Sequence, residues 1–138
     1  MIGYWQRPEE SAEVMRGEWF VTSDLAELDV DGYLTYHGRS DDVMTAMGYR
    51  VSPVEVEEAL AGTSGVGEVA VTTLDVGDAV SIIGAWVVPT PDAADDLPAR
   101  VLARAADVLA PYKRPREVRL VDALPRTANG KVVRRDLA

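Results

Sequence analysis

Residues 125–135 read Pro-Arg-Thr-Ala-Asn-Gly-Lys-Val-Val-Arg-Arg and place one lysine, Lys131, after a turn signal and before a basic stretch. Asn129 and Gly130 both tolerate left-handed backbone, so the pair predicts a turn that carries Lys131 at a loop tip. A lysine at a loop tip can reach a phosphate group. Most exposed lysines are only solvated charges, however, so the interpretation of Lys131 depends on the segments that precede it.

The composition is that of one ordinary globular domain, with 138 residues, 47% of them hydrophobic and 27% charged. Because the chain has no cysteine and one histidine, we expect no bound metal and a reducing, cytoplasmic location. The N-terminus lacks a signal-like apolar run, and the apolar stretch 82–88 is too short to cross a bilayer, so no transmembrane segment is expected.

The charge is unevenly distributed along a chain whose net charge is -9. Residues 113–138 hold eight of the fourteen basic residues and three acidic ones, a net charge of +5 that leaves -14 for the remainder. This balance argues against a nucleic-acid partner, which needs a broad cationic face. A basic tail on an acidic body suits a small polyanion such as a nucleotide or a phosphorylated cofactor, although a merely solvated surface is the alternative.

The N-terminal part combines aromatic residues with a predicted hairpin. Tyr4, Trp5, Trp19 and Phe20 surround a helix-compatible stretch at residues 8–16, for which Ser11 or one of its neighbours is a candidate cap. So short a segment has no core of its own and is expected to pack on another surface. Residues 21–36 predict a hairpin that turns at residues 30–32, and the polar segment 38–42 predicts a boundary or hinge.

The rest of the chain alternates helical and strand patterns. Ser52, Pro53 and Glu55 predict a capping box that starts a helix, with Val56, Ala59 and Leu60 buried, the glutamates at 55, 57 and 58 solvated, and Gly62 as its end. Residues 66–74 and 79–88 predict a hairpin with a turn at Gly77-Asp78 and with Trp86 in the core. Residues 97–109 predict a helix that buries positions 97, 101, 105, 108 and 109, and residues 117–121 predict a third strand. These elements indicate an α+β fold.

Four segments together resemble the C-terminal portion of the adenylate-forming superfamily, which includes acyl-CoA synthetases, peptide-synthetase adenylation domains and firefly luciferase. They are Gly3-Tyr4-Trp5 with Arg7-Pro8-Glu9, residues 19–25 (Trp-Phe-Val-Thr-Ser-Asp-Leu), residues 38–55 from Gly-Arg-Ser-Asp-Asp through Gly-Tyr-Arg, and residues 125–131. The resemblance implies a tail of the large adenylation domain at residues 1–40. It also implies a small C-terminal domain at residues 41–138, with a short hairpin and a three-stranded, mostly antiparallel sheet flanked by helices.

The resemblance also implies roles in adenylation, in which a carboxylate and ATP form an acyl-AMP and pyrophosphate. Lys131 would be the catalytic cation that stabilises charge at the α-phosphate. Asp24 would accept hydrogen bonds from the ribose hydroxyls, and Arg39 would add a donor to the same nucleotide. ATP or AMP and CoA are the expected ligands. Mg²⁺ is implied for the intact enzyme but is not expected to bind to this chain.

A second set of residues is implied to serve thioester formation, for which the small domain swings about a hinge. Asp41 occupies the hinge position. Gly48, Tyr49 and Arg50 would line the path of the CoA pantetheine arm. The sequence departs from the family at Ser23, where glycine is usual, and the loop 75–78 is shorter than expected.

The resembling segments include no phosphate loop and no acyl pocket, so we expect the partner of this chain to be a large adenylation domain that the chain itself lacks. The chain alone is then expected to have little activity. Its sequence does not indicate the acyl substrate. Two alternatives stay open. The chain could belong to a peptide-synthetase adenylation domain that loads a carrier protein. It could also be a noncatalytic interaction fragment that dimerises through its N-terminal aromatic residues.

Overall fold

The computed structural model describes residues 2–77 and 80–137. The chain divides into two compact units, Met1–Asp41 and Asp42–Ala138. All buried hydrophobic residues of the described ranges belong to the second unit. The first unit therefore has no hydrophobic core of its own, as its sequence predicts.

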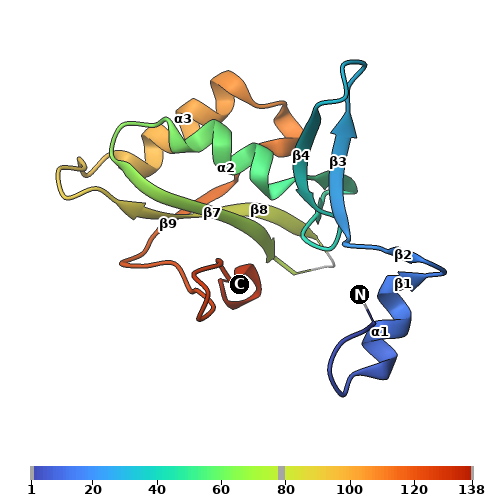
Figure 1. Ribbon diagram of the computed structural model, residues 1–138. Helices are drawn as coiled ribbons and strands as arrows, with labels where there is room; N and C mark the ends of the chain where they lie inside the picture. The colour runs from blue at the N-terminus through green and yellow to red at the C-terminus, as the bar shows by residue number, and fades with distance from the viewer. Residues whose placement is uncertain (1, 78–79, 138) are drawn as a thin grey trace. The chain divides into compact units, whose positions relative to one another are not determined.

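The first unit consists of one short helix and two antiparallel strand pairs (Figure 1). These are α1 (Pro8–Val14), β1 (Met15–Arg16) with β2 (Trp19–Phe20), and β3 (Asp24–Leu28) with β4 (Leu34–Arg39). The predicted hairpin is present, and the Asp29 carboxylate closes its turn by accepting hydrogen bonds from the amides of Asp31 at 3.0 Å and Tyr33 at 2.8 Å. Because β4 continues to Arg39, the first two residues of the predicted boundary at 38–42 belong to a strand.

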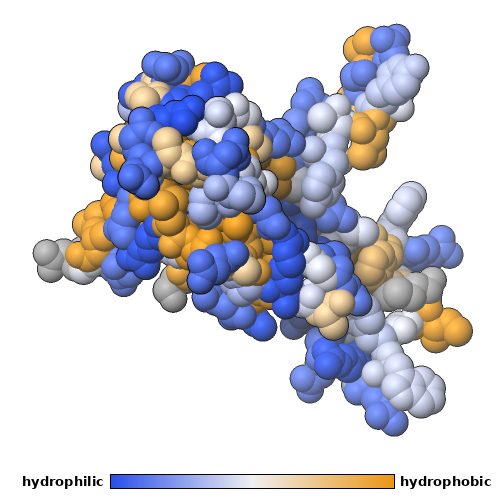
Figure 2. Space-filling model, turned by 90° about the vertical axis from the view of Figure 1, so that its left-hand side faces the viewer, coloured by the Kyte–Doolittle hydropathy of each residue, from blue (hydrophilic) through white to orange (hydrophobic). Residues whose placement is uncertain are grey.

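Large side chains of the first unit are exposed. Trp5 is 87% and Trp19 78% exposed, while the Phe20 ring packs edge-on against Tyr4 with 6.5 Å between centroids. Figure 2 shows that hydrophobic residues also reach the surface of the molecule. The prediction that Ser11 caps the helix is wrong, because Arg7 is the N-cap of α1. The Ser11 hydroxyl instead donates to the Arg7 carbonyl at 2.6 Å and accepts from the Tyr4 amide at 2.8 Å.

The second unit is an α+β domain, which confirms the predicted fold class. Its elements are β5 (Met44–Ala46), β6 (Tyr49–Val51), α2 (Pro53–Ala61), β7 (Val66–Asp75), β8 (Ser81–Pro89), α3 (Leu97–Val108), η1 (Pro111–Lys113), β9 (Glu117–Leu120) and η2 (Arg134–Asp136). β5 and β6 form an antiparallel hairpin. In the three-stranded sheet, β8 is central, with β7 antiparallel and β9 parallel to it.

The sheet has a packed layer on each face. Helices α2 and α3 lie along one face and the C-terminal segment along the other (Figure 1). On the helical side, Val56, Leu60 and Val101 pack against alternate residues of the sheet. On the other side, Trp86 packs with Leu124 and Leu137, so the Trp86 prediction is confirmed. Both clusters follow from the alternation of side chains along β8, which sends neighbouring residues to opposite faces.

Several details of the second unit differ from the predictions. Ser52 is the N-cap of α2 as predicted, but no side-chain hydrogen bond closes the capping box, and the Glu55 carboxylate pairs with Lys113. Val108, predicted to be buried, is 42% exposed because α3 ends there, whereas Leu109 is buried as predicted but with extended backbone. Of the turn predicted at Gly77-Asp78, Gly77 has a φ of 91°, and Asp78 lies outside the described residues.

Replacing Met47 by asparagine is expected to stabilise the second unit. Met47 and Gly48 form the two-residue turn between β5 and β6 with φ of 50° and 82°, and the Met47 side chain is largely exposed. Left-handed backbone is unfavourable for methionine and well tolerated by asparagine, so Met47→Asn should add about 0.5–1 kcal/mol to the free energy of unfolding. Thermal unfolding should show a Tm higher by a few degrees. Gly48→Ala, whose added Cβ meets no atom within 4 Å, is the opposite control and should lower the Tm; an unchanged Tm in both variants would contradict this account.

Candidate functional site

The predicted nucleotide residues lie side by side at the open end of the β3–β4 hairpin. Asp24 and Arg39 are cross-strand partners, and Arg39 Nη1 is 3.8 Å from Asp24 Oδ1. Both side chains are partly exposed. The carboxylate and the guanidinium therefore present acceptors and donors to solvent on one surface of the first unit.

The residue before Asp24 adopts the backbone that glycine prefers. Ser23 has φ 63°, and its carbonyl accepts hydrogen bonds from the Ser40 amide at 2.8 Å and the Ser40 hydroxyl at 3.0 Å. A serine in place of the usual glycine is thus held in the left-handed region by its partner across the hairpin. Ser23 therefore adopts, next to Asp24, the backbone conformation that a glycine would favour.

Asp41, the predicted hinge residue, is bound by Arg39. Arg39 donates from Nε to Asp41 Oδ1 at 2.8 Å and from Nη2 to Oδ2 at 2.7 Å. Such a two-point contact fixes the orientation of a carboxylate more firmly than a single hydrogen bond. The structure therefore brings Asp24, Arg39 and Asp41 together within the first unit.

Lys131 lies on an exposed hairpin loop of the second unit. Arg126 and Val132 form its bridge, the Gly130 amide donates to the Thr127 carbonyl at 2.9 Å, and the Thr127 amide donates to the Lys131 carbonyl at 2.8 Å. Gly130 has φ 81°, whereas Asn129 does not use left-handed backbone, so the predicted turn depends on the glycine alone. Within the described ranges, no ion pair engages Lys131 Nζ, and its ammonium group faces solvent.

The residues predicted for the pantetheine path lie on the β5–β6 hairpin. Gly48 is in the turn, and among the described residues no atom lies within 4 Å of where its Cβ would be, so these residues do not form a narrow passage there. Tyr49 stacks on Tyr112, with 4.7 Å between ring centroids and 25° between planes. Arg50 lies opposite Thr45 and is exposed.

Tyr112 and its neighbour Lys113 extend this surface and were missed by the sequence analysis. Lys113 Nζ lies 5.6 Å from the centroid of the Tyr112 ring and pairs with Glu55. The hydrogen bond from Lys113 to Glu55 raises the pKa of Lys113 above its ordinary value, so the ammonium stays charged at neutral pH. The basic composition of residues 113–138 was a signal for this region, but not for the stacked pair.

A partly buried arginine network was also missed. Arg134 donates from Nε and Nη2 to the two carboxylate oxygens of Glu57 at 3.1 and 2.8 Å, and from Nη1 to Asp42 at 3.2 Å. Glu57 in turn accepts a hydrogen bond from the Val71 amide at 2.9 Å. The prediction that Glu57 faces water is wrong, since its side chain is 17% exposed.

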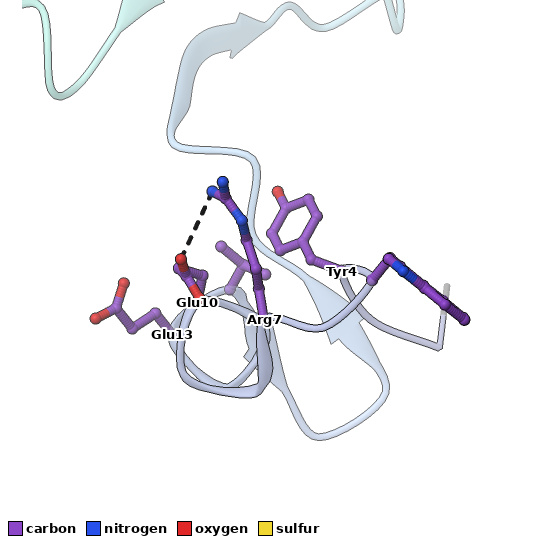
Figure 3. A pocket seen from close by; sticks show the side chains of 6 residues that line it. Tyr4, Arg7, Glu10 and Glu13 are labelled. Atoms are coloured by element: carbon purple, nitrogen blue, oxygen red, sulfur yellow. Dashed lines mark ion pairs between the residues drawn. The ribbon is translucent and has the colours of Figure 1, made fainter.

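The hollow that Figure 3 shows contains none of the predicted site residues. Tyr4, Arg7, Glu10 and Glu13 line it, and Arg7 pairs with Glu10 at 3.6 Å, one helical turn away. Both partners are half exposed or more. In the described ranges no group of three or more histidine or acidic residues could hold a metal ion, and no helix is long and apolar enough to span a membrane.

Comparisons with known proteins cover nearly the whole chain. Residues 55–131 match the family described as AMP-binding enzyme C-terminal domain. Benzoate–CoA ligase of Thauera aromatica is 40% identical over 135 residues, which are 96% of this chain and 26% of that protein. The mitochondrial acyl-coenzyme A synthetase ACSM1 of Mus musculus is 38% identical over 138 residues, which are 97% of this chain and 24% of that protein.

Solved structures agree with the sequence comparisons. The anthranilate CoA ligase AuaEII in complex with anthranoyl-AMP superposes with a TM-score of 0.88 at 36% identity, covering 99% of this chain and 27% of that chain. ATP-bound MatB from Rhodopseudomonas palustris superposes with a TM-score of 0.85 at 35% identity, covering 98% of this chain and 27% of that chain. The chain thus spans about a quarter of the length of the relatives that it matches.

Proposed function

The chain belongs to the AMP-binding enzyme C-terminal domain family, and on that premise we propose that it is the C-terminal catalytic part of an ATP-dependent acyl-CoA synthetase. Residues 41–138 would form the mobile catalytic domain and residues 1–40 the tail of the large adenylation domain. The reaction joins a carboxylate to the α-phosphate of ATP with release of pyrophosphate. The acyl group then moves from AMP to the CoA thiol.

One observation carries this proposal: Lys131, which forms no ion pair within the described residues, lies at the tip of a hydrogen-bonded hairpin and is the last residue of the family match at 55–131. Lys131 is exposed, and its backbone is tied to Thr127 on both sides of the turn. When the carboxylate attacks, negative charge grows on the oxygens of the α-phosphate. A cation held on a preorganised loop stabilises that charge without paying for its own reorganisation.

Asp24 and Arg39 would hold the nucleotide. A carboxylate can accept hydrogen bonds from both vicinal hydroxyls of a ribose, and the adjacent guanidinium can donate to the sugar or to a phosphate. Their pairing across β3 and β4 supports this role. Mg²⁺ does not fit the described residues, which offer no cluster of acidic ligands, and its ligands in the intact enzyme would be the ATP phosphates and other parts of the protein.

Adjacent contacts support Asp41 as the hinge between the two half-reactions. Arg39, in the first unit, binds the carboxylate of Asp41, whereas Arg134, in the second unit, binds Asp42 and is itself held by Glu57. The boundary between the two units falls between these aspartates. A rotation can then be confined to the backbone torsions that join them, because each flanking residue is anchored to its own unit.

The surface around Tyr49 would receive CoA. The stacked rings of Tyr49 and Tyr112 offer an apolar face to the amide arm of CoA, and the Lys113 ammonium beside them, although paired with Glu55, offers a donor to a phosphate. The relatives named above are CoA ligases, which favours free CoA over a carrier protein as acceptor. Titration of the chain with CoA and with a phosphopantetheinylated carrier protein separates the two acceptors.

The exposed aromatic residues of the first unit would be covered by the rest of the large adenylation domain. Trp5 and Trp19 are the main candidates for that contact. Dimerisation through the same residues is the competing arrangement, and light scattering distinguishes them, because only a self-association site gives a dimer of the chain alone. A cytoplasmic location stays a prediction from the absence of cysteine.

A fusion tests the proposed function. The chain replaces the matching quarter of Thauera aromatica benzoate–CoA ligase, and we expect the fusion to form benzoyl-CoA from benzoate, ATP and CoA. Neither the chain alone nor the truncated ligase should do so, because each lacks half of the site. A fusion that folds by circular dichroism and binds benzoate, yet releases no pyrophosphate from ATP, would contradict the proposal.

A further inference from the structure

Arg126 joins the lysine loop to the sheet. Its Nη1 donates to the Gly130 carbonyl at 2.6 Å, and its Nη2 pairs with the carboxylate of Glu68 on β7, 58 residues earlier in the chain. Gly130 immediately precedes Lys131. One guanidinium therefore contacts both the peptide unit that leads into Lys131 and a strand of the central sheet.

The peptide unit between Gly130 and Lys131 is held at both of its polar groups. Arg126 binds its carbonyl, and the Thr127 hydroxyl accepts a hydrogen bond from its N–H at 3.2 Å. The next carbonyl, that of Lys131, accepts from the Thr127 amide. These three contacts define the direction in which the Lys131 side chain leaves the loop.

Burial contributes little to the orientation of the lysine loop. Residues 126–131 are all exposed, whereas Leu124 is buried and Val132 partly buried at the two ends of the loop. Because the residues of this hairpin tip are exposed, polar contacts contribute most of what holds its orientation. Exposed ion pairs such as Arg126–Glu68 contribute little to folding stability, so the main effect of this pair is on loop geometry.

We propose that Arg126, oriented by Glu68, is a positioning residue for Lys131 in the adenylation step. This inference rests on the proposed function, in which Lys131 acts at the α-phosphate. The two nitrogens of Arg126 are used at once, one on the loop and one on the sheet, and a lysine ammonium cannot reproduce that planar, two-ended contact. Pairing with Glu68 also offsets the charge of Arg126, so Lys131 is the cation of the loop that remains available to a phosphate.

The test uses the benzoate–CoA ligase fusion. Arg126→Ala is expected to lower the kcat of pyrophosphate release by about 10- to 100-fold, because small displacements of a reacting group cost up to that much, with little change in the KM for ATP. Thioester formation from supplied benzoyl-adenylate should be unchanged. Arg126→Lys should recover part of the loss, and Glu68→Gln should cause a smaller loss than Arg126→Ala.

Arg119→Ala is the matched control. Arg119 is similarly exposed and, like Arg126, makes two contacts: it pairs with Glu117 at 2.6 Å on β9 and lies 5.5 Å from the centroid of the Trp86 ring, but among the described residues it makes no hydrogen bond or ion pair with the lysine loop. Its loss should leave both half-reactions unchanged. A further measurement, ¹⁵N relaxation of the 138-residue chain, should show a lower order parameter at the Lys131 amide in Arg126→Ala but not in Arg119→Ala.

The outcomes separate this inference from the function on which it rests. A fusion that loses adenylation with Lys131→Ala but keeps it with Arg126→Ala would overturn the positioning role and leave the proposed function intact. Full adenylation by the Lys131→Ala fusion would overturn the proposed function and the inference with it. Equal losses in both half-reactions with Arg126→Ala would show a merely structural role and would also overturn the inference.

Discussion

Replacing Lys131 by alanine is expected to reduce the adenylation half-reaction of the benzoate–CoA ligase fusion by about 10²–10³-fold, the usual effect of removing one preorganised group that stabilises developing negative charge. The loop itself should not change, because its hydrogen bonds involve the Lys131 backbone and not its side chain. Pyrophosphate release from ATP in the presence of benzoate measures this step.

Thioester formation should survive the same substitution. Benzoyl-adenylate supplied with CoA bypasses the step at the α-phosphate, so the Lys131→Ala fusion should form benzoyl-CoA at the unaltered rate. Arg135→Ala is the matched control, since Arg135 is a nearby cation that is 87% exposed and should be dispensable in both assays. Equal losses of rate in the two half-reactions would contradict the assignment of Lys131 to the adenylation step.

Replacing Asp41 by proline is expected to have the reverse effect. Proline fixes φ and restricts the preceding residue, so it removes backbone freedom at the boundary between the two units. If rotation about this point brings in the surface for CoA, thioester formation should fall by on the order of 100-fold, whereas pyrophosphate release should remain within a few-fold of the unsubstituted fusion.

Asp41→Ala separates backbone from side-chain effects. It removes the two hydrogen bonds from Arg39 but leaves φ free, so it should affect thioester formation far less than proline does. Full overall turnover by the Asp41→Pro fusion would show that Asp41 is not the hinge. A loss of the same size with alanine would assign the effect to the Arg39 contact instead.

Much of the fold could be predicted from local patterns. Pro53 and Gly62 bound α2 as expected, because a proline at the first turn and a glycine after the last are compatible with helix ends. β9 was predicted from its alternation, but its parallel pairing with β8 was not, since alternation gives no strand direction. Val108 shows the limit of periodicity: it has the right spacing for burial, but the helix ends there.

The site was predicted less completely than the fold. Asp24, Arg39 and Lys131 were proposed as site residues from short motifs, and the structure bears on their positions but not on their roles: Asp24 and Arg39 are cross-strand partners, and Lys131 is exposed on its loop. Glu57 was mistaken for a solvated residue because its partner, Arg134, lies 77 residues later. No periodicity reveals such a pairing, since burial of one member becomes favourable only when the other is present.

By itself, the sequence determined the α+β class, the two ends of α2, and the exposed position of Lys131 after Gly130, because these depend on backbone preferences and on the spacing of apolar residues. Only the tertiary structure decided how the lysine loop is held. The contact of Arg126 with Glu68, the stacking of Tyr49 on Tyr112 and the anchoring of Asp42 by Arg134 join residues far apart in the chain. Such contacts exist only after the sheet and helices have packed, since packing sets which distant side chains meet.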